Sequence, residues 1–154
     1  MPKIIINADD LGASVAVNEA IESCIKRQLI SSTTIMAGGS AFEDAVRMAK
    51  EYPNISFGVH LTIDEFECLT KPSVFMQKGI TDENGFFIKD GYRKVEHYDN
   101  DLLQAVYTEW KAQIDKVRAA GVKISHVDSH HHCHTYPCFK NVLYDVLKDE
   151  NINK

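Results

Sequence analysis

The sequence predicts an α/β protein whose strands form a parallel sheet. Short runs rich in apolar and β-branched residues alternate with longer stretches in which apolar residues recur at helical spacing. Glycine, proline and asparagine separate these stretches. The predicted order is β-α-β-α-β, a long connection, and then α-β-α, which implies right-handed crossovers between parallel strands. The 154 residues are enough for one domain.

Three strands and two helices are expected in the first part of the chain. The strands are predicted at residues 3–7, 32–37 and 55–61. The first strand is expected to be buried and to lead into a polar turn, Asn7-Ala8-Asp9-Asp10-Leu11-Gly12. Ser14 is expected to cap a helix whose apolar residues recur between Val17 and Ile25. A second helix follows Gly38-Gly39-Ser40 and ends before Pro53.

The second part opens with a long segment, residues 62–99, that has no clear periodicity. Its many aromatic residues favour an ordered, lid-like insertion, with Phe86-Phe87-Ile88 as one arm of a small hairpin. A long amphipathic helix is expected over residues 101–120 and a fourth strand over residues 122–128. A last helix is expected to begin at Pro137.

Composition limits the classes of partner and location. The formal net charge of −5 disfavours nucleic acid, because neutralising phosphates requires a basic surface. No apolar stretch approaches the roughly 18 residues of a membrane span, so no membrane partner is expected. The four cysteines show no C-x-x-C spacing and no signal peptide is recognised, which favours free thiols in the cytoplasm.

Three clusters of potential metal ligands follow three different predicted strands. Asp9 and Asp10 end the first strand, His60 ends the third, and five of the seven histidines lie in residues 126–134. The carboxyl ends of parallel strands share one edge of a sheet, where active sites of α/β proteins lie. Asp10, His60 and His130 would leave coordination positions open for water and substrate, as catalytic metal sites do. Asp9 would then remain free as a base.

Each cluster also has a structural interpretation. Adjacent aspartates are common in turns and helix caps, and a single histidine after a buried strand is usually a hydrogen-bonded structural residue. The histidine-rich run is alternatively a solvated or capping loop. Not every histidine in it can be a ligand, so the neighbouring side chains are expected to orient ligands or to contact substrate. These neighbours are Asp128, His131, His132 and His134.

Four stretches resemble the YdjC-like carbohydrate deacetylases, which include chitooligosaccharide deacetylases. They are residues 7–12, Ser32-Thr33-Thr34, Gly58-Val59-His60-Leu61 and residues 126–132. The resemblance implies a (β/α)-barrel-like fold related to polysaccharide deacetylases, of which this chain supplies the first four β-α units and lacks the C-terminal part. It also implies that Asp10, His60 and His130 hold a divalent metal and that Asp9 is the general base. Family knowledge favours magnesium, whereas imidazole ligands favour zinc or another transition metal.

The resemblance implies hydrolysis of the acetamide of an N-acetylated sugar, commonly a chitin-derived oligosaccharide. Aromatic residues of segment 62–99 would pack on sugar rings. His132 or His134 could protonate the leaving amine, although a residue outside the chain is expected to do so. We further expect the uncovered sheet edges of a half barrel to drive self-association into a dimer.

Two other functions remain open at this stage. Histidine and aspartate clusters at strand ends also serve metal-dependent phosphoesterases, although such sites often use two metals and more carboxylates. Without the C-terminal part of the family fold, the chain is alternatively a metal-binding module that has no turnover.

Overall fold

The computed structural model describes residues 4–153, which contain one four-stranded sheet with helices between its strands. In chain order the elements are β1 (Asn7–Leu11), α1 (Val15–Lys26), β2 (Ser32–Ile35), α2 (Phe42–Glu51), β3 (Ser56–Leu61), α3 (Ser73–Gln77), α4 (Asn100–Ala119), β4 (Ile124–Ser129) and α5 (Lys140–Asp149). Short 3-10 helices occupy Gly91–Lys94, His130–Thr135 and Pro137–Phe139. The α/β class and the four β-α units predicted from the sequence are confirmed.

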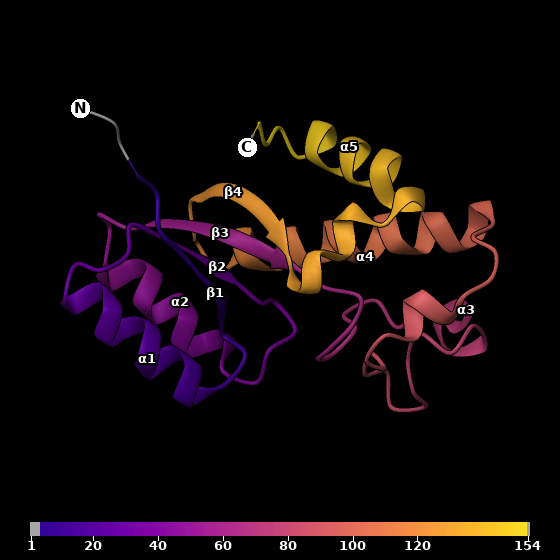
Figure 1. Ribbon diagram of the computed structural model, residues 1–154, viewed down its shortest axis with the longest axis horizontal. Helices are drawn as coiled ribbons and strands as arrows, with labels where there is room; N and C mark the ends of the chain where they lie inside the picture. The colour runs from indigo at the N-terminus through magenta and orange to yellow at the C-terminus, as the bar shows by residue number, and fades with distance from the viewer. Residues whose placement is uncertain (1–3, 154) are drawn as a thin grey trace.

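All neighbouring strands are parallel, and their order in the sheet, β1-β2-β3-β4, follows the chain. Right-handed crossovers in this order place the connecting helices on one face. In Figure 1, α1 and α2 form one pair of helices and α4 and α5 form another. The buried core lies between these helices and the sheet and includes Val59, Leu61 and Trp110.

The opposite face of the sheet is polar. Ser32, Ser56 and His126 line a groove of about 630 Å³ on this face, together with Ile4 and Ile5. Alternate residues of a strand point to opposite faces, so the buried Val59 and Leu61 face the helices while His60 lies on the polar face. The candidate ligands therefore lie on the polar face, near the carboxyl ends of the strands.

The first strand begins later than the sequence suggested. Residues 3–7 were expected to be a buried strand, but β1 spans Asn7–Leu11 and contains both aspartates. Ile4, Ile5 and Ile6 are exposed, and Lys3 lies outside the described residues. The reason is register: Asn7 pairs with Ser32 and Leu11 with Ile35, so the polar stretch forms the ladder with β2. The apolar run at residues 3–7 therefore predicted the wrong first residue for β1.

The other boundaries differ from the predictions by smaller amounts. The strand β2 ends at Ile35 instead of residue 37, and β4 begins at Ile124 instead of residue 122. Ser14 caps α1 as expected, since its hydroxyl accepts a hydrogen bond from the Val17 N–H. Pro137 opens a 3-10 helix that leads directly into α5.

Segment 62–99 lies beyond the arrowheads of β3 and β4 in Figure 1 and contains α3. Isolated antiparallel bridges join Glu67 to Phe86 and Thr81 to Phe87, so the stretch around Asn84-Gly85 folds back on itself. The buried side chain of Glu109 on α4 holds the start of the segment, because it accepts hydrogen bonds from the Leu69 and Thr70 N–H groups at 3.1 and 2.9 Å. The segment is therefore tied to the core.

Among the residues described, no helix combines the length and the apolar character needed to cross a lipid bilayer.

Candidate metal centre

Asp10 lies in an irregular part of β1 that changes the direction of its side chain. Its φ of 68° is left-handed, and the pairing register with β2 shifts between Ala8 and Leu11. Adjacent residues of a regular strand point to opposite faces, but a bulge re-aims one of them. Asp9 and Asp10 consequently line the same cavity, of about 510 Å³, at the carboxyl edge of the sheet.

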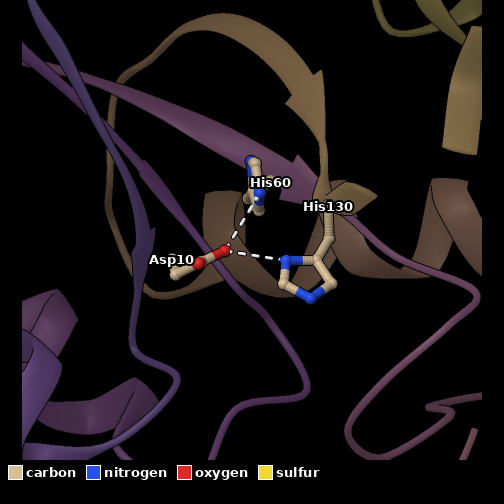
Figure 2. A group of neighbouring side chains, drawn as sticks. All are labelled: Asp10, His60 and His130. Atoms are coloured by element: carbon tan, nitrogen blue, oxygen red, sulfur yellow. Dashed lines mark hydrogen bonds and ion pairs between the residues drawn. The ribbon is translucent and has the colours of Figure 1, made fainter. Parts of the chain in front are cut away.

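Asp10, His60 and His130 converge from β1, from β3 and from the turn after β4 (Figure 2). The Oδ1 atom of Asp10 lies 3.1 Å from His60 Nε2 and 2.8 Å from His130 Nδ1. Both histidines are buried, whereas the Asp10 side chain is 38% exposed. The structure thus brings together the three residues predicted as ligands, although their sequence separations reach 120 residues.

The charges of these groups are strongly coupled. Hydrogen bonds from His130 and His60 hold the pKa of the Asp10 carboxyl well below its usual range. Burial opposes protonation of His60, but hydrogen bonds to Asp10 and Asp128 outweigh it and raise its pKa to about 9. Burial likewise opposes protonation of His130, and the bond to Asp10 raises its pKa above the ordinary value. The carboxylate therefore attracts positive charge to this point.

A second layer of polar side chains holds His60. The Nδ1 atom of His60 hydrogen-bonds to Asp128 Oδ1, and Thr34 Oγ1 lies 3.2 Å from the same nitrogen. Thr34 also donates to Asp128 Oδ2 at 3.1 Å. A carboxylate on the far nitrogen of a metal-binding histidine fixes its orientation and raises its basicity. Asp128 lies at the far nitrogen of His60, which fits one of the two roles that the sequence analysis left open for it.

Asp9 lies beside the centre, with a carboxylate oxygen within 4.8 Å of a ring nitrogen of His60. It is exposed and accepts a hydrogen bond from Asn7 Nδ2 at 2.7 Å. The same Asn7 amide lies 3.4 Å from Asp128 Oδ2, so one side chain links the two aspartates. Asp9 therefore places an exposed carboxylate at the edge of the cavity.

The histidines of the histidine-rich turn lie in different environments. His131 and His132 have left-handed φ values of 49° and 52°, and both line the cavity beside Asp10. Left-handed non-glycine residues store strain and cluster at functional sites. His134 instead hydrogen-bonds to Ser129 through Nδ1 and does not line that cavity. The sequence pattern alone could not show which of these histidines line the cavity.

Sequence reasoning missed two carboxylates in segment 62–99. Asp64 is fully buried and hydrogen-bonds to His131 Nδ1, while Glu65 Oε2 lies 3.3 Å from His130 Nε2. Both follow His60 by only four or five residues. Acidic residues immediately after a strand that ends in a candidate ligand are the pattern that could have identified them.

The donor set fits a divalent cation. Asp10, His60 and His130 each offer one ligand atom, and these atoms lie within 4.8 Å of one another. The adjoining cavity leaves the other coordination directions open. Two further groups overlap with this one: Asp9, His60 and Asp128, and Glu65, His130 and His131. Because His60 and His130 attract protons here, binding a cation would release them.

Comparison with known proteins identifies relatives of this chain. The chain is 35% identical over 150 residues to a carbohydrate deacetylase of Vibrio cholerae, covering 97% of this chain and 57% of the relative. A carbohydrate deacetylase of Brevibacillus brevis is 33% identical over 152 residues, with the same coverage. The chain therefore spans somewhat more than half the length of these relatives.

A solved structure and a protein family match as well. The structure, from Enterococcus faecalis V583, is described as a proposed cellobiose-phosphate cleavage protein. It aligns with a TM-score of 0.81 and 30% identity, over 96% of this chain and 56% of that one. The family described as YdjC-like protein matches residues 3–154. The parallel sheet and these matches agree, and the chain belongs to the YdjC-like protein family.

Proposed function

We propose that this chain carries the metal centre and the general base of a deacetylase that acts on N-acetylated sugars such as chitooligosaccharides. The observation that carries the proposal is the convergence of Asp10, His60 and His130 at a cavity that Asp9 also lines. The relatives named carbohydrate deacetylase support the reaction class. A cytoplasmic location, supported by the four free cysteines, is part of the same proposal.

The reaction is hydrolysis of an acetamide. A divalent cation, magnesium or zinc, held by Asp10, His60 and His130 would supply an electrophile for the acetyl carbonyl and lower the pKa of water. Asp9 takes the proton of the water that attacks the carbonyl carbon. The C–N bond then breaks, and the amine leaves with a proton from a donor. Of the two histidines considered as donors, His132 lines the cavity and His134 does not.

The test measures acetate release from N,N′-diacetylchitobiose and metal affinity on the same variants. Asp9→Asn should keep the metal and lose about 10²- to 10⁴-fold in rate, the range for removal of a general base. Glu19→Gln, an exposed carboxylate on α1, is the matched control and should behave as the wild type. Full turnover by Asp9→Asn would overturn the base assignment. Metal binding without any acetate release from the wild-type chain would favour the metal-binding module.

A metal-dependent phosphoesterase is the second candidate function. Glu65, His130 and His131 form a second potential ligand group that shares His130 with the first. Two-metal phosphoesterases use neighbouring cations in this way. Hydrolysis of p-nitrophenyl phosphate, compared with acetate release under the same metal, separates the two reactions. Phosphatase turnover that is lost in Glu65→Gln, together with no acetate release, would replace the deacetylase proposal.

We also propose that the chain self-associates as a dimer. The strands β1 and β4 are the outer strands of the four-stranded sheet, and the side chains of Ile4, Ile5 and Ile6 are exposed beside β1. Unpaired strand edges and exposed apolar residues favour association. Sedimentation equilibrium over a range of concentrations tests this, and a stable monomer throughout would contradict it.

A further inference from the structure

Glu65 has the same place beside His130 that Asp128 has beside His60. The Nε2 atom of His60 faces Asp10, and its Nδ1 atom hydrogen-bonds to Asp128. His130 is arranged in the opposite sense, with Nδ1 2.8 Å from Asp10 Oδ1 and Nε2 3.3 Å from Glu65 Oε2. Figure 2 shows the second nitrogen of His130 pointing away from Asp10. The deacetylase reaction proposed above gives Glu65 no role.

The far nitrogen of a metal-binding histidine needs an acceptor. An imidazole that binds a cation through one nitrogen carries its proton on the other, and the group that accepts this N–H fixes the orientation of the ring. A carboxylate can only accept, and the structure contains such a bond between Glu65 Oε2 and His130 Nε2. The side chain of His130 is 9% exposed, so bulk water is a poor substitute for this acceptor.

The turn that carries Glu65 is fixed to the core of the fold. The Thr62 hydroxyl accepts hydrogen bonds from the N–H groups of Asp64 and Glu65 at 3.1 and 3.3 Å. Gln113 on α4 holds Thr62 in turn, because it accepts from the Thr62 N–H at 3.0 Å and donates to the Thr62 carbonyl at 2.9 Å. Thr62 and Gln113 are both fully buried. The position of the Glu65 backbone is therefore set before any ligand binds.

The same turn also holds the next histidine of the histidine-rich turn. The buried Asp64 hydrogen-bonds to His131 Nδ1 and accepts a second bond from the Asp90 N–H. Two consecutive carboxylates therefore contact two consecutive histidines. The ring centroids of His130 and His131 lie 3.9 Å apart, so holding one ring restricts the other.

The surroundings of Glu65 favour a supporting role over that of a ligand to a second cation. Its Oε1 atom lies 3.1 Å from Lys89 Nζ, so one oxygen pairs with an ammonium group while the other faces His130. Lys89 also lines the cavity beside Asp10. A second cation bound to Glu65 would lie near this positive charge, and like charges repel.

We propose that Glu65 is a positioning residue of the metal centre, which accepts a hydrogen bond from His130 Nε2 and so directs His130 Nδ1 toward a cation beside Asp10. The inference rests on the metal centre of the proposed function. It assigns segment 62–99 a part in forming that centre, because Glu65 and Lys89 both belong to the segment.

The test titrates Co²⁺ into the metal-free 154-residue chain, with calorimetry for affinity and visible absorption for the arrangement of the ligands. Glu65→Ala should lower the affinity about tenfold, or about 1.4 kcal/mol, and should change the absorption bands because the His130 ring is no longer held. Glu65→Gln keeps an acceptor oxygen, so it should lose less affinity and retain the wild-type bands. Glu67→Gln is the matched control, since Glu67 is 43% exposed and pairs with Lys71, and it should behave as the wild type.

The outcomes separate the role of Glu65 from the metal centre on which it rests. Wild-type affinity and bands in Glu65→Ala overturn the positioning role and leave the metal centre in place. Two cations per wild-type chain, one of which is lost in Glu65→Ala, would make Glu65 a ligand instead. An equal loss in Glu67→Gln would show that negative charge in general attracts the cation. Absence of Co²⁺ binding by the wild type overturns the metal centre and this inference together.

Discussion

Asp10 and Glu109 both accept several hydrogen bonds, but the groups around them differ in kind. Glu109 is fully buried on α4 and accepts from the Leu69 and Thr70 backbone, from the Thr70 hydroxyl and from the Gln113 amide. These donors are neutral and belong to the fold. Asp10 faces two imidazoles whose pKa values are raised and an open cavity.

The difference shows how a carboxylate becomes structural or functional. Neutral donors from the backbone and side chains occupy the carboxylate oxygens of Glu109. Glu109 can therefore hold the start of segment 62–99 in place, but its oxygens are not available to a ligand. Asp10 is hydrogen-bonded to the ring nitrogens of His60 and His130, and a bound cation can replace the protons on these nitrogens. Solvent also reaches the Asp10 side chain. We therefore expect the two residues to affect different measurements when they are changed.

The largest effect is expected for Glu109→Ala. The substitution removes the side-chain acceptor of the Leu69 and Thr70 N–H groups. It also removes one of the two acceptors of Gln113 Nε2, which keeps its bond to the Thr62 carbonyl. Loss of a buried, multiply hydrogen-bonded carboxyl group should lower the free energy of unfolding by about 3–5 kcal/mol. Urea denaturation measures this, with the exposed Glu19→Ala as control within about 0.5 kcal/mol of the wild type. A loss below 1 kcal/mol for Glu109→Ala would show that the anchor is dispensable.

Asp10→Asn should act on metal affinity instead of stability. Asparagine tolerates the left-handed conformation at this position, so the fold should be retained. The variant lacks the anionic ligand, and affinity for zinc or magnesium should fall by more than about 100-fold, or 2.7 kcal/mol. Isothermal titration with each metal checks the loss. Unchanged affinity would assign the cation to one of the two overlapping ligand groups.

A smaller effect on the same measurement is expected for Asp128→Asn. The change weakens the bond that orients His60 but keeps all three ligands. The loss of metal affinity should be about 10-fold, the lower end of the range for residues that support metal ligands. Thr34→Val, which removes a weaker contact to the same nitrogen, should have less effect. An equal or greater loss than in Asp10→Asn would indicate that Asp128 itself binds the metal.

The smallest effect concerns Glu150, which joins α5 to Lys111 and Arg118 of α4. Burial raises its pKa, but hydrogen bonds from the two cations outweigh burial, and the pKa lies below the ordinary value of 4.5. The ion pairs therefore stabilise the fold above pH 4.5, and this contribution is lost as the pH falls through the lower folded pKa. Glu150→Gln should cost about 1 kcal/mol at neutral pH.

Denaturation of both proteins at several pH values tests the sign of this effect. The difference between the wild type and Glu150→Gln should shrink as the pH is lowered. A difference that stays constant or grows in acid would contradict the assignment of the pKa shift to the ion pairs.

Much of the fold followed from the sequence, because apolar spacing identifies helices and strands when each has one buried face. The helix α1 began after its predicted cap, Ser14, and the four strands are parallel as predicted. The start of β1 was wrong because hydropathy alone does not contain the pairing register with Ser32. Glu109 and Gln113 were also missed on α4, since buried polar residues break the apolar pattern that predicts the inner face.

The candidate site was predictable to the level of the three residues that are proposed to bind the metal. Strand ends in a parallel sheet share an edge, so the convergence of Asp10, His60 and His130 follows from topology. The roles within the histidine-rich turn did not follow, because left-handed residues at His131 and His132 set the side-chain directions locally. Asp64 and Glu65 contact that turn across 65 or more residues of sequence, which residue spacing cannot show.

The left-handed backbone at Asp10, His131 and His132 has a consequence for directed evolution of this chain. Residues held in this conformation each cost about 1–3 kcal/mol, and glycine relieves that cost. A library screened only for heat tolerance should therefore enrich glycine at these positions, where substitution removes groups from the candidate site. Stability and metal binding would then be selected in opposite directions, and a screen for robust variants must include metal binding from its first round.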